Sequence, residues 1–169
     1  MIFGMPPFTF IHTLISLVGI ATGLVVLFAG LLVGKHLPRW TARFLASTVL
    51  TSVTGFMLPA AGFMPSHGVG ILSLLVLAVS LFALYSKHLA GAWRRTYVIT
   101  AVIALYLNVF VLVAQLFAKV PALKALAPTQ NDPPFKVAQL LVLVAFIILG
   151  ALAAVRFRPT LPGIAAPAS

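Results

Sequence analysis

Five long apolar segments dominate this chain of 169 residues. They cover approximately residues 8–33, 41–58, 69–86, 96–118 and 137–155. A helix needs about 20 mostly apolar residues to cross the hydrocarbon core of a bilayer. Hydrophobic residues make up 62% of the chain and charged residues only 7%, too few to cover the surface of a soluble domain. The sequence therefore predicts an all-α integral membrane protein, a bundle of five transmembrane helices.

The same segments predict the domain organisation. Because the connections between them are short, we expect one five-helix transmembrane domain over residues 1–158. Residues 159–169 are rich in Pro and Ala and are predicted to form a flexible tail.

Positive charges predict the orientation of the bundle. Eight basic residues fall on one side, after the first, third and fifth segments: Lys35, Arg39, Arg43, Lys87, Arg94, Arg95, Arg156 and Arg158. The other side carries three, Lys119, Lys124 and Lys136. Because Lys and Arg are retained on the cytoplasmic side, we expect the N-terminus outside and the C-terminus inside. The net charge of +10 suits a bilayer with anionic lipid, and its dispersal among helix ends argues against a nucleic-acid partner.

Four glycines mark one face of the first segment. At about 100° per residue, Gly19, Gly23, Gly30 and Gly34 fall within an arc of about 60°. Small residues in such a stripe let another helix backbone approach closely. The stripe is predicted to pack either within the bundle, or against a second copy of the chain or a partner in a membrane complex.

Polar side chains gather toward the predicted outer end of the bundle. The candidates for a ligand-binding pocket there are His12, His67, Asn108, Gln115, Gln130, Asp132 and Gln139. Asn108 lies deepest, near the bilayer centre, where an amide must face protein or a cavity. It is predicted to be either a clamp between helices or a ligand contact. A quinone, haem, metal or lipid would be the class of ligand for this pocket.

His12 and His67 are the residues that a cofactor would use. Two histidines at the same depth on neighbouring helices could bind a b-type haem axially, or a transition metal with a carboxylate or water completing the shell. The alternative is a hydrogen-bonded pair, or two unrelated histidines. His36 and His88 accompany lysines at the inner boundary and are predicted to be interfacial anchors.

Asp132 is the only acidic residue of the chain. It precedes Pro133, and an Asp cap followed by Pro at the first helical position is a helix-start signal, because the carboxylate accepts unpaired N–H groups of the first turn. The alternative is that the same carboxylate also forms a wall of the pocket.

Catalytic motifs do not appear in the sequence. There is no cysteine and no pair of carboxylates. There is also no nucleophile elbow and no phosphate-binding loop. We therefore assign no catalytic residue. Three functional classes stay open: a binding protein with an outer pocket, a structural or assembly subunit that packs through the glycine stripe, and a carrier or oxidoreductase.

The run LPRWTARFLASTVLTSVTGF, followed by a His before the third segment, resembles small uncharacterised bacterial inner-membrane proteins, a family of the domain-of-unknown-function type. In that pattern a His of the first helix precedes a His-Arg-Trp loop and a helix rich in Ser, Thr and Gly. Pro38 stands here at the position of the loop His, while Arg39 and Trp40 match. The resemblance covers about residues 10–86, and the segments LNVFVLVAQ and APTQNDPPF extend it over about 105–140. It implies a multi-pass protein of the inner membrane and no particular chemistry.

Overall fold

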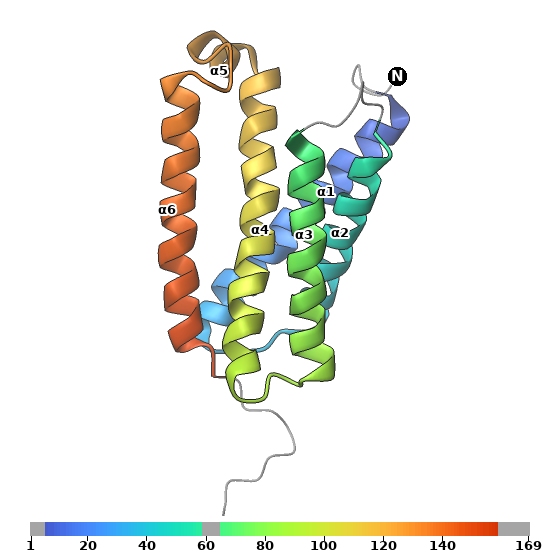
Figure 1. Ribbon diagram of the computed structural model, residues 1–169, viewed down its shortest axis with the longest axis vertical. Coiled ribbons are helices and arrows are strands. Elements are labelled where there is room, and N and C mark those ends of the chain that lie inside the picture. The colour runs from blue at the N-terminus through green and yellow to red at the C-terminus, as the bar shows by residue number, and fades with distance from the viewer. Residues whose placement is uncertain (1–5, 59–64, 159–169) are drawn as a thin grey trace, which may run out of the picture.

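The fold is a bundle of helices, seen in a computed structural model that describes residues 6–58 and 65–158 (Figure 1). Its α-helices are α1 (Pro7–Val25), α2 (Pro38–Phe56), α3 (Pro65–Leu81), α4 (Ala92–Lys119), α5 (Pro121–Leu126) and α6 (Pro133–Arg156). A π-helical turn, η1 (Val26–Gly30), and a 3-10 turn, η2 (Leu31–Val33), extend α1, and a second π-helical turn, η3 (Phe82–Ser86), extends α3. The described residues contain no strand, which confirms the all-α prediction. The predicted tail, residues 159–169, lies outside the described residues.

The helices extend beyond the apolar segments that predicted them. The second helix begins at Pro38 rather than near residue 41, and the last begins at Pro133 rather than near 137. Proline suits the first turn of a helix because the N–H that it lacks has no partner there. The predicted loop between the last two segments contains α5, which also begins at a proline, Pro121. The apolar runs therefore located the helices but underestimated the length of two of them, because their first turns contain proline and charged residues.

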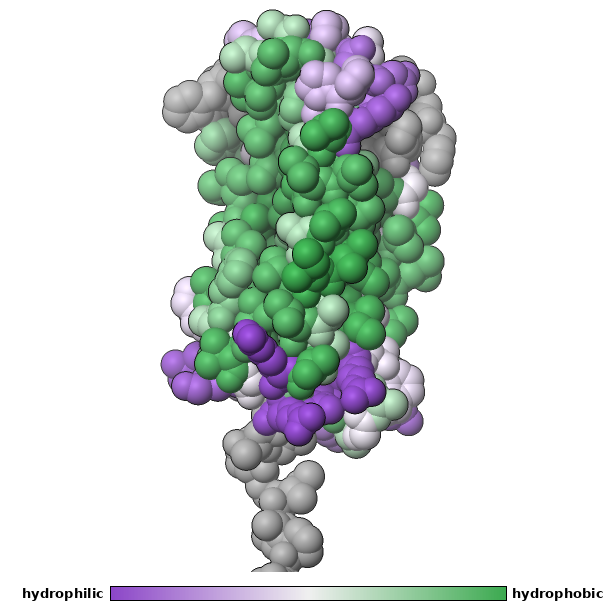
Figure 2. Space-filling model, turned by 90° about the vertical axis from the view of Figure 1, so that its left-hand side faces the viewer, coloured by the Kyte–Doolittle hydropathy of each residue, from purple (hydrophilic) through white to green (hydrophobic). Residues whose placement is uncertain are grey.

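Within the described residues, four helices are long and apolar enough to cross a membrane: Pro7–Val33, His67–Ser86, Ala92–Lys119 and Pro133–Arg156. This indicates an integral membrane protein. The remaining long helix, α2, has 19 residues but is less apolar, because it carries Arg39, Arg43 and several hydroxyl side chains. Figure 2 shows the corresponding surface, an apolar belt with hydrophilic residues at both ends.

The long helices run alternately up and down, so their connections fall at two ends of the bundle (Figure 1). We call the end that holds α5 the α5 end. The opposite end holds the α1–α2 and α3–α4 connections and the last turn of α6. We call it the basic end because it carries eight of the eleven basic residues: Lys35, Arg39, Arg43, Lys87, Arg94, Arg95, Arg156 and Arg158. Helix α4 is central, since it contacts α1, α2, α3 and α6.

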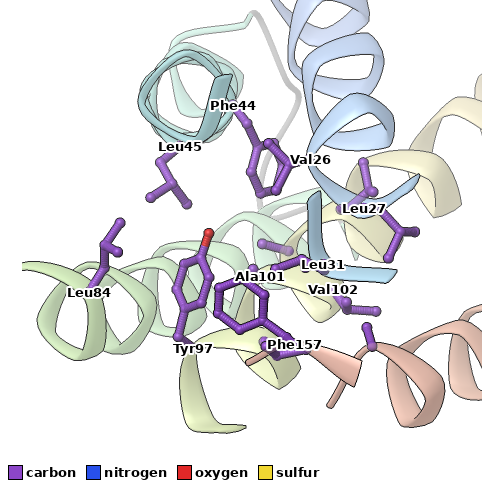
Figure 3. Packing of buried hydrophobic residues seen from close by; sticks show 14 of the residues in the cluster. Val26, Leu27, Leu31, Phe44, Leu45, Leu84, Tyr97, Ala101, Val102 and Phe157 are labelled. Atoms are coloured by element: carbon purple, nitrogen blue, oxygen red, sulfur yellow. The ribbon is translucent and has the colours of Figure 1, made fainter. Parts of the chain in front are cut away.

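The best-buried side chains gather toward the basic end, where Figure 3 shows Tyr97 of α4 among residues of η1, η2, α2, η3 and the chain end after α6. The Tyr97 ring is fully buried, and its centroid lies 5.9 Å from that of Phe157. Arg94 Nη1 donates a hydrogen bond of 2.9 Å to the Phe157 carbonyl oxygen. A cation at the C-terminal end of a helix satisfies a free carbonyl and interacts favourably with the helix dipole. This contact therefore ties the end of α6 to the start of α4.

The glycine stripe packs within the chain. A Cβ atom on Gly23 would lie 2.6 Å from Leu105 Cδ1 and 2.8 Å from the Phe44 ring, so α1 crosses α2 and α4 at this point. Gly19 faces Ser47 of α2 in the same way, at 3.3 Å. Gly30 and Gly34 lie in the irregular end of the first span rather than on a regular helix face.

Gly34 has a separate role as a turn residue. Its φ of +79° ends η2 in the left-handed region, where glycine is favoured. A Cβ there would lie 3.0 Å from the carbonyl oxygen of Arg156. Helical periodicity predicted one packing stripe, but its glycines have two roles. Gly19 and Gly23 let helices pack closely, whereas Gly34 allows the left-handed backbone conformation that ends η2.

Candidate functional site

A cavity of about 260 Å³ opens between α1, α2, α3 and α4 in the half of the bundle nearest the α5 end. Its lining includes four of the candidates from the sequence, one from α1, one from α3 and two from α4: His12, His67, Asn108 and Gln115. Apolar side chains complete the wall, among them Phe56, Leu107 and Val111. The structure thus places at one cavity four side chains that are separated by up to a hundred residues in the chain. An apolar cavity with a few convergent polar groups is the usual form of a small-molecule site.

The orientation of His12 is set by a residue of the neighbouring helix. Nδ1 of His12 lies 2.8 Å from Oγ1 of Thr54. The Thr54 hydroxyl itself donates to the carbonyl oxygen of Leu50 at 2.7 Å, one turn back in α2. A threonine has a single hydroxyl hydrogen, so with that hydrogen directed to Leu50 its oxygen would accept from His12 Nδ1–H. The imidazole would then be the tautomer whose Nε2 carries a lone pair, and Nε2 could accept a hydrogen bond or bind a metal.

Thr51 adds a buried hydroxyl to the cavity wall. Its side chain is 8% exposed, and Oγ1 has no hydrogen-bond partner among the described residues. Leaving a buried hydroxyl unpaired costs about 1–3 kcal/mol. Thr in a helix populates two χ1 rotamers, so the hydroxyl can occupy a second staggered position. A ligand with a hydrogen-bonding group could therefore recover this energy.

Asn108 serves as a clamp and also lines the cavity. Its Nδ2 donates a hydrogen bond of 3.2 Å to Oγ1 of Thr48, which joins α4 to α2. The amide nitrogen has two hydrogens, and one of them is sufficient for this bond. The two roles predicted as alternatives for Asn108 are thus compatible in this geometry.

A pair of serines in the cavity wall joins α3 to α2. Ser52 Oγ lies 3.0 Å from Ser73 Oγ, and both side chains are buried. These serines were not among the candidates predicted from the sequence. Their signal was a hydroxyl in the middle of each apolar segment, where hydroxyl groups often bond between helices.

His67 lies in the first turn of α3, at the mouth of the cavity. Its ring stacks on Phe56 of α2, with centroids 5.7 Å apart and planes 12° from parallel. Gly70, one turn further, allows this approach, since a Cβ there would lie 3.0 Å from the Phe56 ring. Gln115 is exposed and forms the rim on the side of α4.

Gln130, Asp132 and Gln139 are not among the residues that line this cavity. Gln130 is exposed in the connection before α6. Gln139 faces α4 instead, where its Nε2 donates to the carbonyl oxygen of Phe110 at 3.0 Å. Its Oε1 is buried without a hydrogen-bond partner among the described residues.

Asp132 occupies the cap position of α6, as predicted, but its carboxylate makes different hydrogen bonds. Oδ2 accepts from the backbone N–H of Thr129 at 2.7 Å and from its hydroxyl at 2.9 Å, and the side chain makes no hydrogen bond to α6. The prediction that the carboxylate would accept N–H groups of the first turn was therefore wrong. The reason is that Pro133 and Pro134 begin the helix and have no N–H to donate. The carboxylate closes the preceding turn instead.

The site offers hydrogen-bonding groups rather than charges. No three His, Cys, Asp or Glu side chains within residues 6–58 and 65–158 gather closely enough to form a metal centre. His12 and His67 are the two nitrogen donors at the cavity, so a haem or metal ligand set built on them stays a prediction. The cavity can accept a ligand that both donates and accepts hydrogen bonds. Comparisons of the chain with family models, curated proteins and solved structures gave no match.

Proposed function

We propose that this chain is a binding protein of the bacterial inner membrane that holds the head group of a small, neutral, ring-containing lipid such as a quinol in the cavity between α1 and α4. The observation that carries the proposal is that His12, held by Thr54 at 2.8 Å, lines a largely apolar cavity together with the amide of Asn108 and with Thr51. One hydroxyl of a quinol would donate to His12 Nε2. Its second hydroxyl would accept from Asn108 or Thr51.

The cavity volume supports a ligand of this size. A cavity of about 150 Å³ accepts a benzene ring, and pockets for drug-sized ligands begin at about 300 Å³. At about 260 Å³ the cavity has room for one substituted ring. No acidic or basic side chain other than the two histidines lines it, which favours a neutral head group over an ion.

The membrane topology belongs to the same proposal. We take α2 as a fifth membrane-spanning helix, because its 19 residues lie between spanning helices and its buried hydroxyls bond inside the bundle. Five spans place eight of the eleven basic residues on one side. The positive-inside rule then puts the basic end in the cytoplasm and the α5 end, with the cavity, outside.

A binding titration tests the ligand class. The full chain, purified in mild detergent, is titrated with a short-chain benzoquinol and separately with its quinone. We expect saturable binding that weakens about two- to tenfold in Thr51→Val and in His12→Phe, since each removes one hydrogen bond. Thr100→Val is the matched control, because Thr100 also lies in a spanning helix but bonds only to backbone carbonyl oxygens of α4.

Two results would count against the quinol. Absence of saturable binding in a folded wild-type protein would remove this ligand class. A visible absorption band or a stoichiometric metal in the purified protein, lost in both His12→Ala and His67→Ala, would replace the quinol with a haem or a metal ion.

A further inference from the structure

A second cavity, of about 310 Å³, lies between α4 and α6 and shares no lining residue with the first. Its walls are apolar: Ile99, Ile103 and Tyr106 of α4 face Phe146, Gly150 and Ala151 of α6. Small residues of α6 create the hollow. A Cβ on Gly150 would lie 3.2 Å from Val102 Cγ1, so the helices meet closely here, and the groove follows this contact.

Arg95 marks the end of this groove toward the basic end. It lies four residues before Ile99, one turn away on the same face of α4, and it is exposed. Arg94 beside it is already bonded to the Phe157 carbonyl, which places the end of α6 and Arg158 at the same level. The only acidic residue, Asp132, lies at the opposite end of α6, so no acidic side chain of the protein lies beside these cations.

We propose that the groove binds an acyl chain of an anionic phospholipid, and that Arg95 binds the phosphate of its head group. From Ile99 to Tyr106 the helix rises about 10 Å, which matches the part of a lipid chain nearest its head group. A continuous apolar slot that ends in an unneutralised cation complements a lipid that combines a negative phosphate with an apolar chain. Figure 2 shows the face of the bundle on the side of α6, where the apolar belt ends in hydrophilic residues.

Native mass spectrometry of the full chain in detergent tests this site. Phosphatidylglycerol and phosphatidylcholine with identical chains are added in parallel, and bound lipid is counted. We expect phosphatidylglycerol to bind more tightly, and Arg95→Gln to weaken it about fivefold, the factor equivalent to about 1 kcal/mol per basic residue near an anionic surface. Arg39→Gln, an exposed arginine of α2 at the same end, is the control.

A second pair of variants tests the groove itself. Ala151→Phe fills it and is expected to abolish tight binding of phosphatidylglycerol. Ala145→Phe, which adds the same ring to an exposed position of α6 outside the groove, should leave it intact. If Ala151→Phe lowers the thermal midpoint strongly, Ala154→Leu fills the same groove with a smaller side chain.

Three outcomes would overturn the proposal. Equal losses in Arg39→Gln and Arg95→Gln would mean a diffuse attraction to the basic end. If a folded groove-filling variant still binds phosphatidylglycerol tightly, the acyl chain of the lipid does not occupy the groove. An equal thermal stabilisation by inorganic phosphate alone would mean an anion site without a lipid. The quinol titration above uses different residues, so either proposal can fail while the other holds.

Discussion

His12 Nδ1 lies 2.8 Å from Thr54 Oγ1 and joins α1 to α2 across 42 positions of the sequence. With the Thr54 hydroxyl donating to its own helix, this bond would place the proton of His12 on Nδ1 and leave a lone pair on Nε2. Thr54, which is not among the residues that line the cavity, thus orients a histidine that does line it.

Thr54→Val should separate these two effects. It removes the acceptor of His12 and is expected to cost about 0.5–1.5 kcal/mol of stability, measured by thermal unfolding in detergent. Quinol binding should also weaken, although His12 is still present, because the ring loses its fixed tautomer. Thr13→Val is the control, since Thr13 bonds only to the carbonyl oxygen of Thr9 in α1. Unchanged binding in a Thr54→Val protein would show that the bond does not orient the ligand site.

Gly23→Ala should destabilise the bundle. The added methyl would lie 2.6 Å from Leu105 Cδ1 and 2.8 Å from the Phe44 ring, and both side chains are almost fully buried. Overpacking of this kind costs about 1–3 kcal/mol. Gly68→Ala in α3 is the matched control, because a Cβ there meets no atom within 4 Å. It should be neutral or stabilise by up to about 1 kcal/mol. Equal thermal midpoints for the two variants would contradict the assigned contact of α1 with α2 and α4.

Asp132→Asn should have a small effect on stability and none on ligand binding. An amide oxygen can still accept from the Thr129 N–H, so we expect a loss below about 1 kcal/mol, whereas Asp132→Ala removes both hydrogen bonds. The titration with benzoquinol should give the same affinity for all three proteins. Weaker binding in a fully stable Asp132→Asn protein would bring back the alternative in which this carboxylate acts at the pocket.

His36 should make stability depend on pH. Burial lowers the pKa of His36 below its ordinary value of 6.5, and its Nε2 is buried without a hydrogen-bond partner among the described residues. The unfolded chain therefore binds a proton more readily than the folded one. Stability should be greatest above about pH 6.5 and should fall as the pH drops below it. His36→Gln should reduce this dependence in thermal unfolding. Identical pH profiles for wild type and His36→Gln would exclude His36 as the source.

For the polar side chains, the sequence predicts depth in the bundle but not which neighbouring helix each one faces. Depth along each helix follows from counting residues at 1.5 Å per residue, so His12, His67 and Gln115 could be placed at the same level. Counting does not tell which way each helix is rotated or which helices are neighbours. Gln139 faces α4, where it donates a hydrogen bond to the Phe110 carbonyl oxygen. Asp132 accepts a hydrogen bond from Thr129 in the turn before α6.

The sequence by itself determined the helices, because a backbone in an apolar medium must satisfy its hydrogen bonds within each segment, and long apolar runs can do so only as helices. It also located the close approach at Gly23, since a stripe of small residues requires a partner backbone. Tertiary structure alone decided which polar side chains share the cavity, because it adds Thr51, Ser52 and Ser73 and leaves out Asp132 and Gln139. This selection depends on contacts between residues far apart in the chain, and no local pattern records it.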